Sequence, residues 1–167
     1  MKDNERVIFR DTPDKYIGLA NEIIPPFLKL IESIVQLEDE AYAKGQEMNE
    51  EKAKMGISES TEYPDARNYW NNYREQYRAL VSASCTERLL SRPIGGSIQH
   101  PARYNAAITK PVFFTMKSNK KATLDIGEYE GTHMKHCFIL KNEDGVWKID
   151  EVRYGFRNGD SWYIEEI

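Results

Sequence analysis

The spacing of apolar residues changes near Pro111, and this change constrains the fold more than any other feature. Before it, apolar side chains recur every three or four residues, which is typical of amphipathic helices. After it, apolar and polar residues alternate, as in strands with one buried face. Five such segments are expected, near 111–118, 121–130, 132–142, 146–157 and 161–166. The links between them are too short for parallel crossovers, so the sequence predicts helices followed by an antiparallel sheet.

The expected turns contain the residues that tight hairpins require. They lie at Ser118-Asn119-Lys120, Gly131, Asn142–Gly145 and Arg157–Asp160.

The fourth segment indicates that the sheet is curved. Trp147 and Ile149 share one parity, whereas Val152 and Tyr154 have the other. A β-bulge near Asp150-Glu151 would return all four side chains to one face, and a bulge also bends a strand. We therefore predict a curved antiparallel sheet.

Three helices are expected before the sheet. Thr12-Pro13-Asp14 offers a hydroxyl N-cap, a proline at the first helical position and an acid near the positive end of the helix dipole. Pro25-Pro26 removes two backbone donors and should break or kink this helix, and Pro64-Asp65 marks a later start. The helices are predicted over 13–24, 26–45 and 65–83. Aromatic residues expected in the core are Trp70, Tyr73, Tyr77, Phe114, Phe138, Trp147 and Tyr154.

Length and composition indicate one α+β domain over residues 1–167. No window approaches the roughly 18 consecutive apolar residues of a membrane span, and the charged N-terminus does not resemble a signal peptide, so we expect a cytoplasmic protein without membrane contact. The two cysteines lack metal-type spacing, and we expect no metal and no cofactor. A net charge of −4 argues against general nucleic-acid binding and favours a basic protein partner.

The negative charge is concentrated between residues 38 and 62. This segment contains eight acidic residues and three lysines, a net charge of −5, whereas residues 64–167 contain 15 Lys and Arg against 13 Asp and Glu, a net charge of +2. Glu38 stands apart, because its helical angle places it within the apolar stripe of Ile31, Ile34 and Val35. Either the helix has left the core by this point, or Glu38 is an acid of a pocket or interface.

Two stretches carry a resemblance to a known family. The run Asp144–Phe156, followed by Asp160-Ser161-Trp162-Tyr163, resembles the C-terminal signature of immunity proteins that have the nuclear transport factor 2-like fold. These proteins accompany Rhs-type polymorphic toxins in bacteria, and Tyr69–Tyr73 is also similar to them. The resemblance implies a cone in which N-terminal helices pack on a curved antiparallel sheet. It also implies that the protein binds and neutralises a cognate toxin domain by forming a stoichiometric complex.

Toxin domains that attack nucleic acids present basic clefts, so an acidic surface would suit such a partner. We therefore expect the acidic segment to form the contact surface. The expected toxin-binding residues are Glu38, Asp39, Glu40, Glu47, Glu50 and Glu51.

An enzymatic alternative stays open, since the same scaffold also carries isomerases and dehydratases. Polar residues on the strands could line the cone pocket and transfer protons if they converged. These pocket candidates are Asp125, His136, Asp150 and Tyr154. We expect no catalytic residues, because nothing near His136 in the sequence supplies an acid–base partner. Apolar residues of the outer sheet face, among them Phe113, Cys137 and Ile139, are expected at a homodimer contact.

Overall fold

The computed structural model describes residues 6–127, 134–156 and 158–167 as one mixed α+β unit. The chain begins with strand β1 (Val7–Arg10) and a 3-10 turn, η2 (Asp14–Tyr16). The helices are α1 (Ile17–Met55), α2 (Ala66–Ser82), α3 (Glu87–Leu90) and α4 (Ala106–Thr109). The remaining strands are β2 (Val112–Ser118), β3 (Lys121–Ile126), β4 (Met134–Glu143), β5 (Val146–Phe156) and β6 (Trp162–Glu165).

The six strands form a single sheet in the order β1-β2-β3-β4-β5-β6. All pairs from β2 to β6 are antiparallel, which confirms the predicted meander, although the expected turn at Gly131 lies outside the described residues. Strand β1 was not predicted, and it pairs with β2 in parallel, with Val7 opposite Val112. Four residues at a sheet edge are too few to show a periodicity, and their pairing partner lies about a hundred residues away in the chain.

The predicted bulge is confirmed. Ile139 of β4 lies opposite Glu151 of β5, but the next residue, Leu140, lies opposite Ile149, so Asp150 is the extra residue on β5. Ile149 and Val152 are consequently both buried on the face that packs against α1.

The predicted break at Pro25-Pro26 is wrong, because both prolines lie inside α1. One helix runs from Ile17 to Met55 in place of the two expected helices. Both prolines are exposed, and so are Asn21 and Glu22, which lie four residues earlier. Because proline has no backbone N–H, the carbonyl oxygens of Asn21 and Glu22 accept no helical hydrogen bond from it and can bind water instead. The expected cap residue Thr12 does not cap this helix, because its hydroxyl accepts the amide of Met116 in β2. Helix α2 agrees with its predicted span.

The core lies between α1 and the sheet. Phe27 of α1 contacts Phe138 of β4 with a centroid distance of 4.9 Å, and Tyr104 packs on the same ring at 5.0 Å. Of the aromatic residues predicted to be buried, four are buried and three are half-buried. The buried ones are Tyr73, Tyr77, Phe114 and Phe138; the half-buried ones are Trp70, Trp147 and Tyr154.

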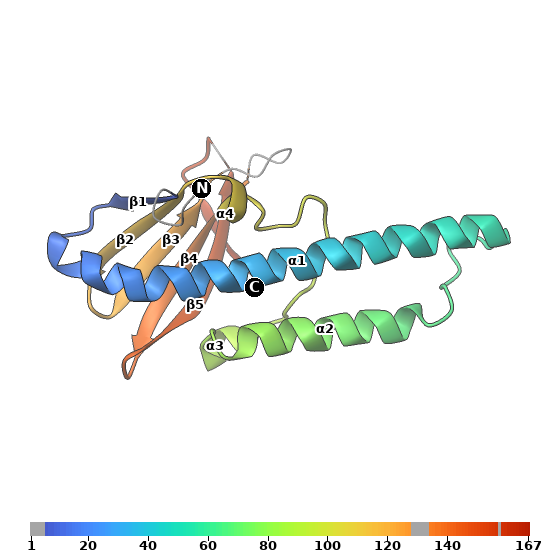
Figure 1. Ribbon diagram of the computed structural model, residues 1–167, viewed down its shortest axis with the longest axis horizontal. Coiled ribbons are helices and arrows are strands. Elements are labelled where there is room, and N and C mark those ends of the chain that lie inside the picture. The colour runs from blue at the N-terminus through green and yellow to red at the C-terminus, as the bar shows by residue number, and fades with distance from the viewer. Residues whose placement is uncertain (1–5, 128–133, 157) are drawn as a thin grey trace.

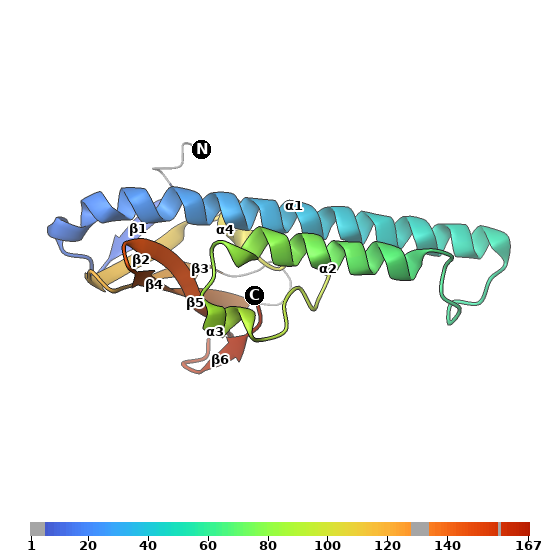
Figure 2. The same ribbon diagram turned by 90° about the horizontal axis from the view of Figure 1, so that it is seen from below.

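Helix α1 extends well beyond the sheet, and α2 runs beside its distal half (Figures 1 and 2). We call this two-helix extension, residues 38–75, the helical arm. Within the described residues, no helix has the length and apolarity needed to cross a membrane.

Two glycines with left-handed backbones permit a matched test of this packing. Gly56, at the end of α1, has φ of 66° and open space around an added Cβ. Gly95 has φ of 64°, but its Cβ would lie 2.9 Å from Cγ of the buried Tyr77 ring. We expect Gly56→Ala to cost about 1–2 kcal/mol of unfolding free energy from backbone strain alone. Gly95→Ala should cost about 1–3 kcal/mol more because of the clash.

Chemical denaturation of both variants would measure the difference. Equal losses in the two variants would show that the loop at Gly95 does not pack tightly on Tyr77.

Candidate functional site

The acidic residues expected at a contact surface differ in exposure. Asp39, Glu40, Glu47 and Glu50 are exposed on the helical arm, and Glu51 is half-buried. Glu38 is 0% exposed, so it does not contribute to the surface of the arm and cannot contact a partner in this conformation. The prediction is corrected at Glu38, since α1 has not left the core at this turn.

Several carboxylates of the arm have partners within the chain. Lys44 binds Glu47 at 2.8 Å, and the Tyr63 hydroxyl donates to Glu51. Glu40 accepts a hydrogen bond from the neutral amide of Gln36 at 2.9 Å and so keeps its charge uncompensated. Exposed pairs of this kind contribute about 0–1 kcal/mol. Because a paired cation cancels part of a carboxylate's charge, the negative potential of the arm is strongest at carboxylates without a cation, such as Glu40.

A buried polar cluster forms where α1 passes from the sheet to α2. Arg103, in the connection before α4, donates its backbone amide to Glu38 Oε2 at 2.8 Å. Its guanidinium donates to the Tyr77 hydroxyl at 3.1 Å and to the Glu166 carbonyl at 2.9 Å. The same group lies 3.9 Å from Glu38 Oε1 and 3.6 Å from Glu165 Oε1. One cation thus connects both helices to the C-terminal strand.

Burial sets the protonation of this cluster. Desolvation raises the pKa of Glu38, although the charge of Arg103 and its backbone amide oppose the shift. Desolvation also raises the pKa of Tyr73 to about 12 and that of Tyr104 well above its usual value, so both phenols stay neutral. Glu38 Oε1 and the Tyr73 hydroxyl are buried without a hydrogen-bond partner among the described residues.

The structure does not bring the four pocket candidates together. His136 and Tyr154 lie opposite each other on β4 and β5, on the face that packs against the helices. Asp125 lies between the inward-facing Leu124 and Ile126, so strand alternation points it to the outer face, opposite Cys137. Burial raises the pKa of the Cys137 thiol, and the nearby Asp125 carboxylate raises it further.

His136 has an acidic partner that its sequence neighbourhood does not contain. Its Nδ1 lies 2.8 Å from Glu165 Oε2 of β6, and its ring packs edge-on against Tyr104 at 5.1 Å. The imidazole is 1% exposed and therefore closed to solvent in this conformation.

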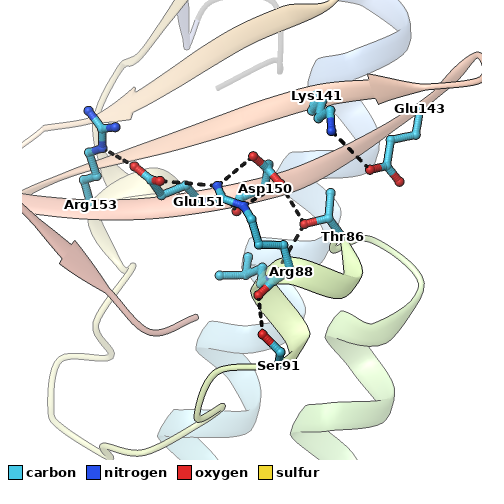
Figure 3. A network of polar contacts seen from close by, with 9 residues as sticks. Thr86, Arg88, Ser91, Lys141, Glu143, Asp150, Glu151 and Arg153 are labelled. Carbon is cyan, nitrogen blue, oxygen red and sulfur yellow. Dashed lines mark hydrogen bonds and ion pairs between the residues drawn. The ribbon is translucent and has the colours of Figure 1, made fainter.

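Asp150, the bulge residue, belongs to a separate network on the outer face (Figure 3). Arg88 of α3 binds Asp150 Oδ2 at 2.7 Å and Glu151 Oε2 at 3.3 Å, and the Thr86 hydroxyl donates to Asp150 Oδ1 at 2.9 Å. Hydrogen bonds from Arg88 lower the pKa of the Asp150 carboxyl, with burial opposing. Thr86 also accepts the amide of Leu89 and so caps α3. The bulge thus fastens α3 to the sheet.

Part of the apolar surface expected at a homodimer contact is covered within the chain. The Arg10 guanidinium lies 3.4 Å from the centroid of the Phe113 ring, and Ile139 is only 7% exposed. Phe156 of β5 and the apolar residues of β6, the last strand of the sheet, are more exposed than these residues, with Ile164 57% exposed. Self-association stays a prediction.

Arg103 and Glu165 were missed by sequence reasoning. Arg103 lies in a connecting stretch rich in proline and glycine, where no periodicity marks a buried side chain. The one available signal was Glu38, because a carboxylate within an apolar stripe requires a buried cation or donor somewhere in the fold.

Comparison of the chain with protein-family models, curated proteins and solved structures gives no match. Among the described residues, no group of three or more His, Cys, Asp or Glu side chains is arranged to hold a metal ion.

The raised pKa of Glu38 predicts a specific pH dependence. A carboxyl whose pKa is raised by folding stabilises the protein below its unfolded pKa, near 4.5, and this contribution is lost as the pH rises through the folded pKa. Glu38→Gln keeps an acceptor for the Arg103 amide without a charge. Because glutamine does not titrate, the Glu38→Gln variant should not lose this stability contribution as the pH rises. The unfolding free energy of the variant minus that of the unmodified protein should therefore increase between pH 4.5 and pH 7.

Glu38→Ala provides the contrast, because it removes the acceptor and leaves the Arg103 amide unpaired. We expect it to cost about 2–4 kcal/mol at pH 7. Denaturation of the three proteins at both pH values measures these effects. A Glu38→Gln variant with the unmodified pH dependence would contradict the assignment.

The Thr86 hydroxyl offers a second test. Thr86→Val preserves shape but removes both the α3 cap and the bond to Asp150, and we expect a loss of about 1–3 kcal/mol. Thr86→Ser keeps the hydroxyl and should lose less. Thermal unfolding compares them, and equal losses would mean that the methyl group, rather than the two hydrogen bonds, stabilises the junction.

Proposed function

We propose that the protein is an immunity protein of the nuclear transport factor 2-like class, which neutralises a cognate toxin domain by stoichiometric binding through its helical arm. The supporting observation is the exposure of Asp39, Glu40, Glu47 and Glu50 on an arm that projects from the sheet. A projecting helix pair presents its side chains to a partner from more than one side.

Electrostatics support this choice of surface. With Glu38 buried, residues 38–62 keep seven acidic residues against three lysines outside the core, a net charge of −4. Residues 64–167 net +2, so the negative potential is local to the arm. A complementary patch raises the association rate by steering, and it can occupy a basic cleft in the partner.

The enzymatic alternative has less support from the geometry. His136 is buried against Glu165, Asp150 is held by Arg88 and Thr86, and Asp125 lies on the opposite sheet face. His136 and Glu165 form an acid–base pair, but the imidazole is 1% exposed, and a general acid or base must reach its substrate. The proposal therefore rests on binding.

Charge reversal on the arm tests the proposal. Glu40→Lys with Glu50→Lys should weaken binding to the toxin domain encoded beside this gene by at least tenfold at low salt, mainly through a slower association rate. The difference should shrink at moderate salt because ions screen exposed charges. Surface plasmon resonance at two salt concentrations, together with survival of cells that express the toxin, provides the measurements.

Glu22→Lys with Asp160→Lys is the matched control, since both residues are exposed, lie outside the arm and change the net charge equally. Its affinity should stay near that of the unmodified protein. Equal weakening in both double variants would exclude the arm as the specific contact, and absence of binding by the unmodified protein would overturn the proposed function.

A further inference from the structure

The outer face of the sheet contains a cationic hollow that the proposed function does not use. Its volume is about 380 Å³, and it lies beside the bulge, between α3 and the β2–β3 turn. Five cationic side chains and two acidic ones line it, a net charge of +3. The cations are Arg88, Lys120, Lys121, Lys141 and Arg153, and the acids are Asp150 and Glu151.

The strand register places lysines directly opposite one another across the sheet. Lys121 of β3 lies opposite Lys141 of β4, which in turn lies opposite Lys148 of β5. Like charges in directly opposed positions destabilise a sheet. Glu143 partly offsets the repulsion, with its carboxylate 3.7 Å from the Lys141 ammonium and 3.6 Å from that of Lys148. One carboxylate thus serves two of the three lysines, and Glu143 makes no ion pair with Lys121.

The arginines and lysines of the hollow differ in what they already bind. Arg88 and Arg153 hold the carboxylates of Asp150 and Glu151, as Figure 3 shows. Within residues 6–127, 134–156 and 158–167, the side-chain ammonium groups of Lys120 and Lys121 make no hydrogen bond or ion pair. The hollow therefore has walls fixed by the arginine network and an uncompensated positive charge from the lysines.

We propose that this hollow binds a small phosphorylated molecule with at least two adjacent phosphate groups. Lysine ammonium groups bind phosphate oxygens as point charges, and several of them together match a multiply charged anion. The volume falls within the range of small-molecule sites. An extended nucleic acid fits less well, because the chain has a net charge of −4 and carboxylates border the hollow. The site does not depend on the proposed toxin binding.

Inorganic pyrophosphate is the probe. Isothermal titration calorimetry of the full chain should show saturable binding, and pyrophosphate should raise the melting temperature more than sulfate does at equal ionic strength. Lys121→Gln with Lys141→Gln should weaken pyrophosphate binding at least tenfold. Without ligand, this variant should melt at the same temperature as the unmodified protein or higher, because the repulsion is relieved.

Lys29→Gln with Lys54→Gln is the charge-matched control, since both lysines are exposed on α1, and its affinity should be unchanged. Equal binding by the Lys121/Lys141 variant, or an effect of pyrophosphate no larger than that of sulfate, would overturn the proposal. Tighter binding of a short DNA duplex or of phosphatidic acid vesicles through the same lysines would also overturn it, in favour of a macromolecular or lipid ligand.

Discussion

Helix α1 packs across the sheet but is longer than the surface that the sheet offers, and the rest of the structure follows from this mismatch. Its 39 residues span about 58 Å at 1.5 Å per residue. The first part buries Ile23, Ile24 and Phe27 against the strands. Beyond Glu38 the helix needs another apolar surface, which α2 supplies. The arm therefore exists because one helix serves two packing partners in succession.

The change of partner occurs at the buried polar cluster. Glu38 comes from α1, Tyr77 from α2, and Glu165 from β6, and all three lie against Arg103. A buried ion pair contributes little net stability compared with apolar residues of similar volume, but removing one partner is costly because the other is left uncompensated. We therefore interpret the cluster as fixing how the arm, the connection before α4 and the last strand meet, more than as a source of stability.

What the sequence predicts depends on how far apart the interacting residues lie. The strands, α2 and the bulge at Asp150 follow from local periodicity and parity, and the structure confirms them. The break at Pro25-Pro26 was wrong because local propensity yielded to the buried face of α1. Strand β1, Arg103 and the Glu165 partner of His136 depend on contacts between distant segments, which one sequence does not reveal.

The two charged surfaces illustrate the same distinction. The acids of the arm are nearly contiguous in the chain, so their concentration is visible in the sequence. Lys121 lies 20 residues before Lys141 and 27 residues before Lys148 in the chain, and the three form a row only through strand register. A net charge of −4 therefore argues against extended polyanions, which sample the whole surface, but it does not argue against a compact anion that meets only the hollow. The composition argument and the proposed phosphate site are thus compatible, because they concern potentials on different length scales.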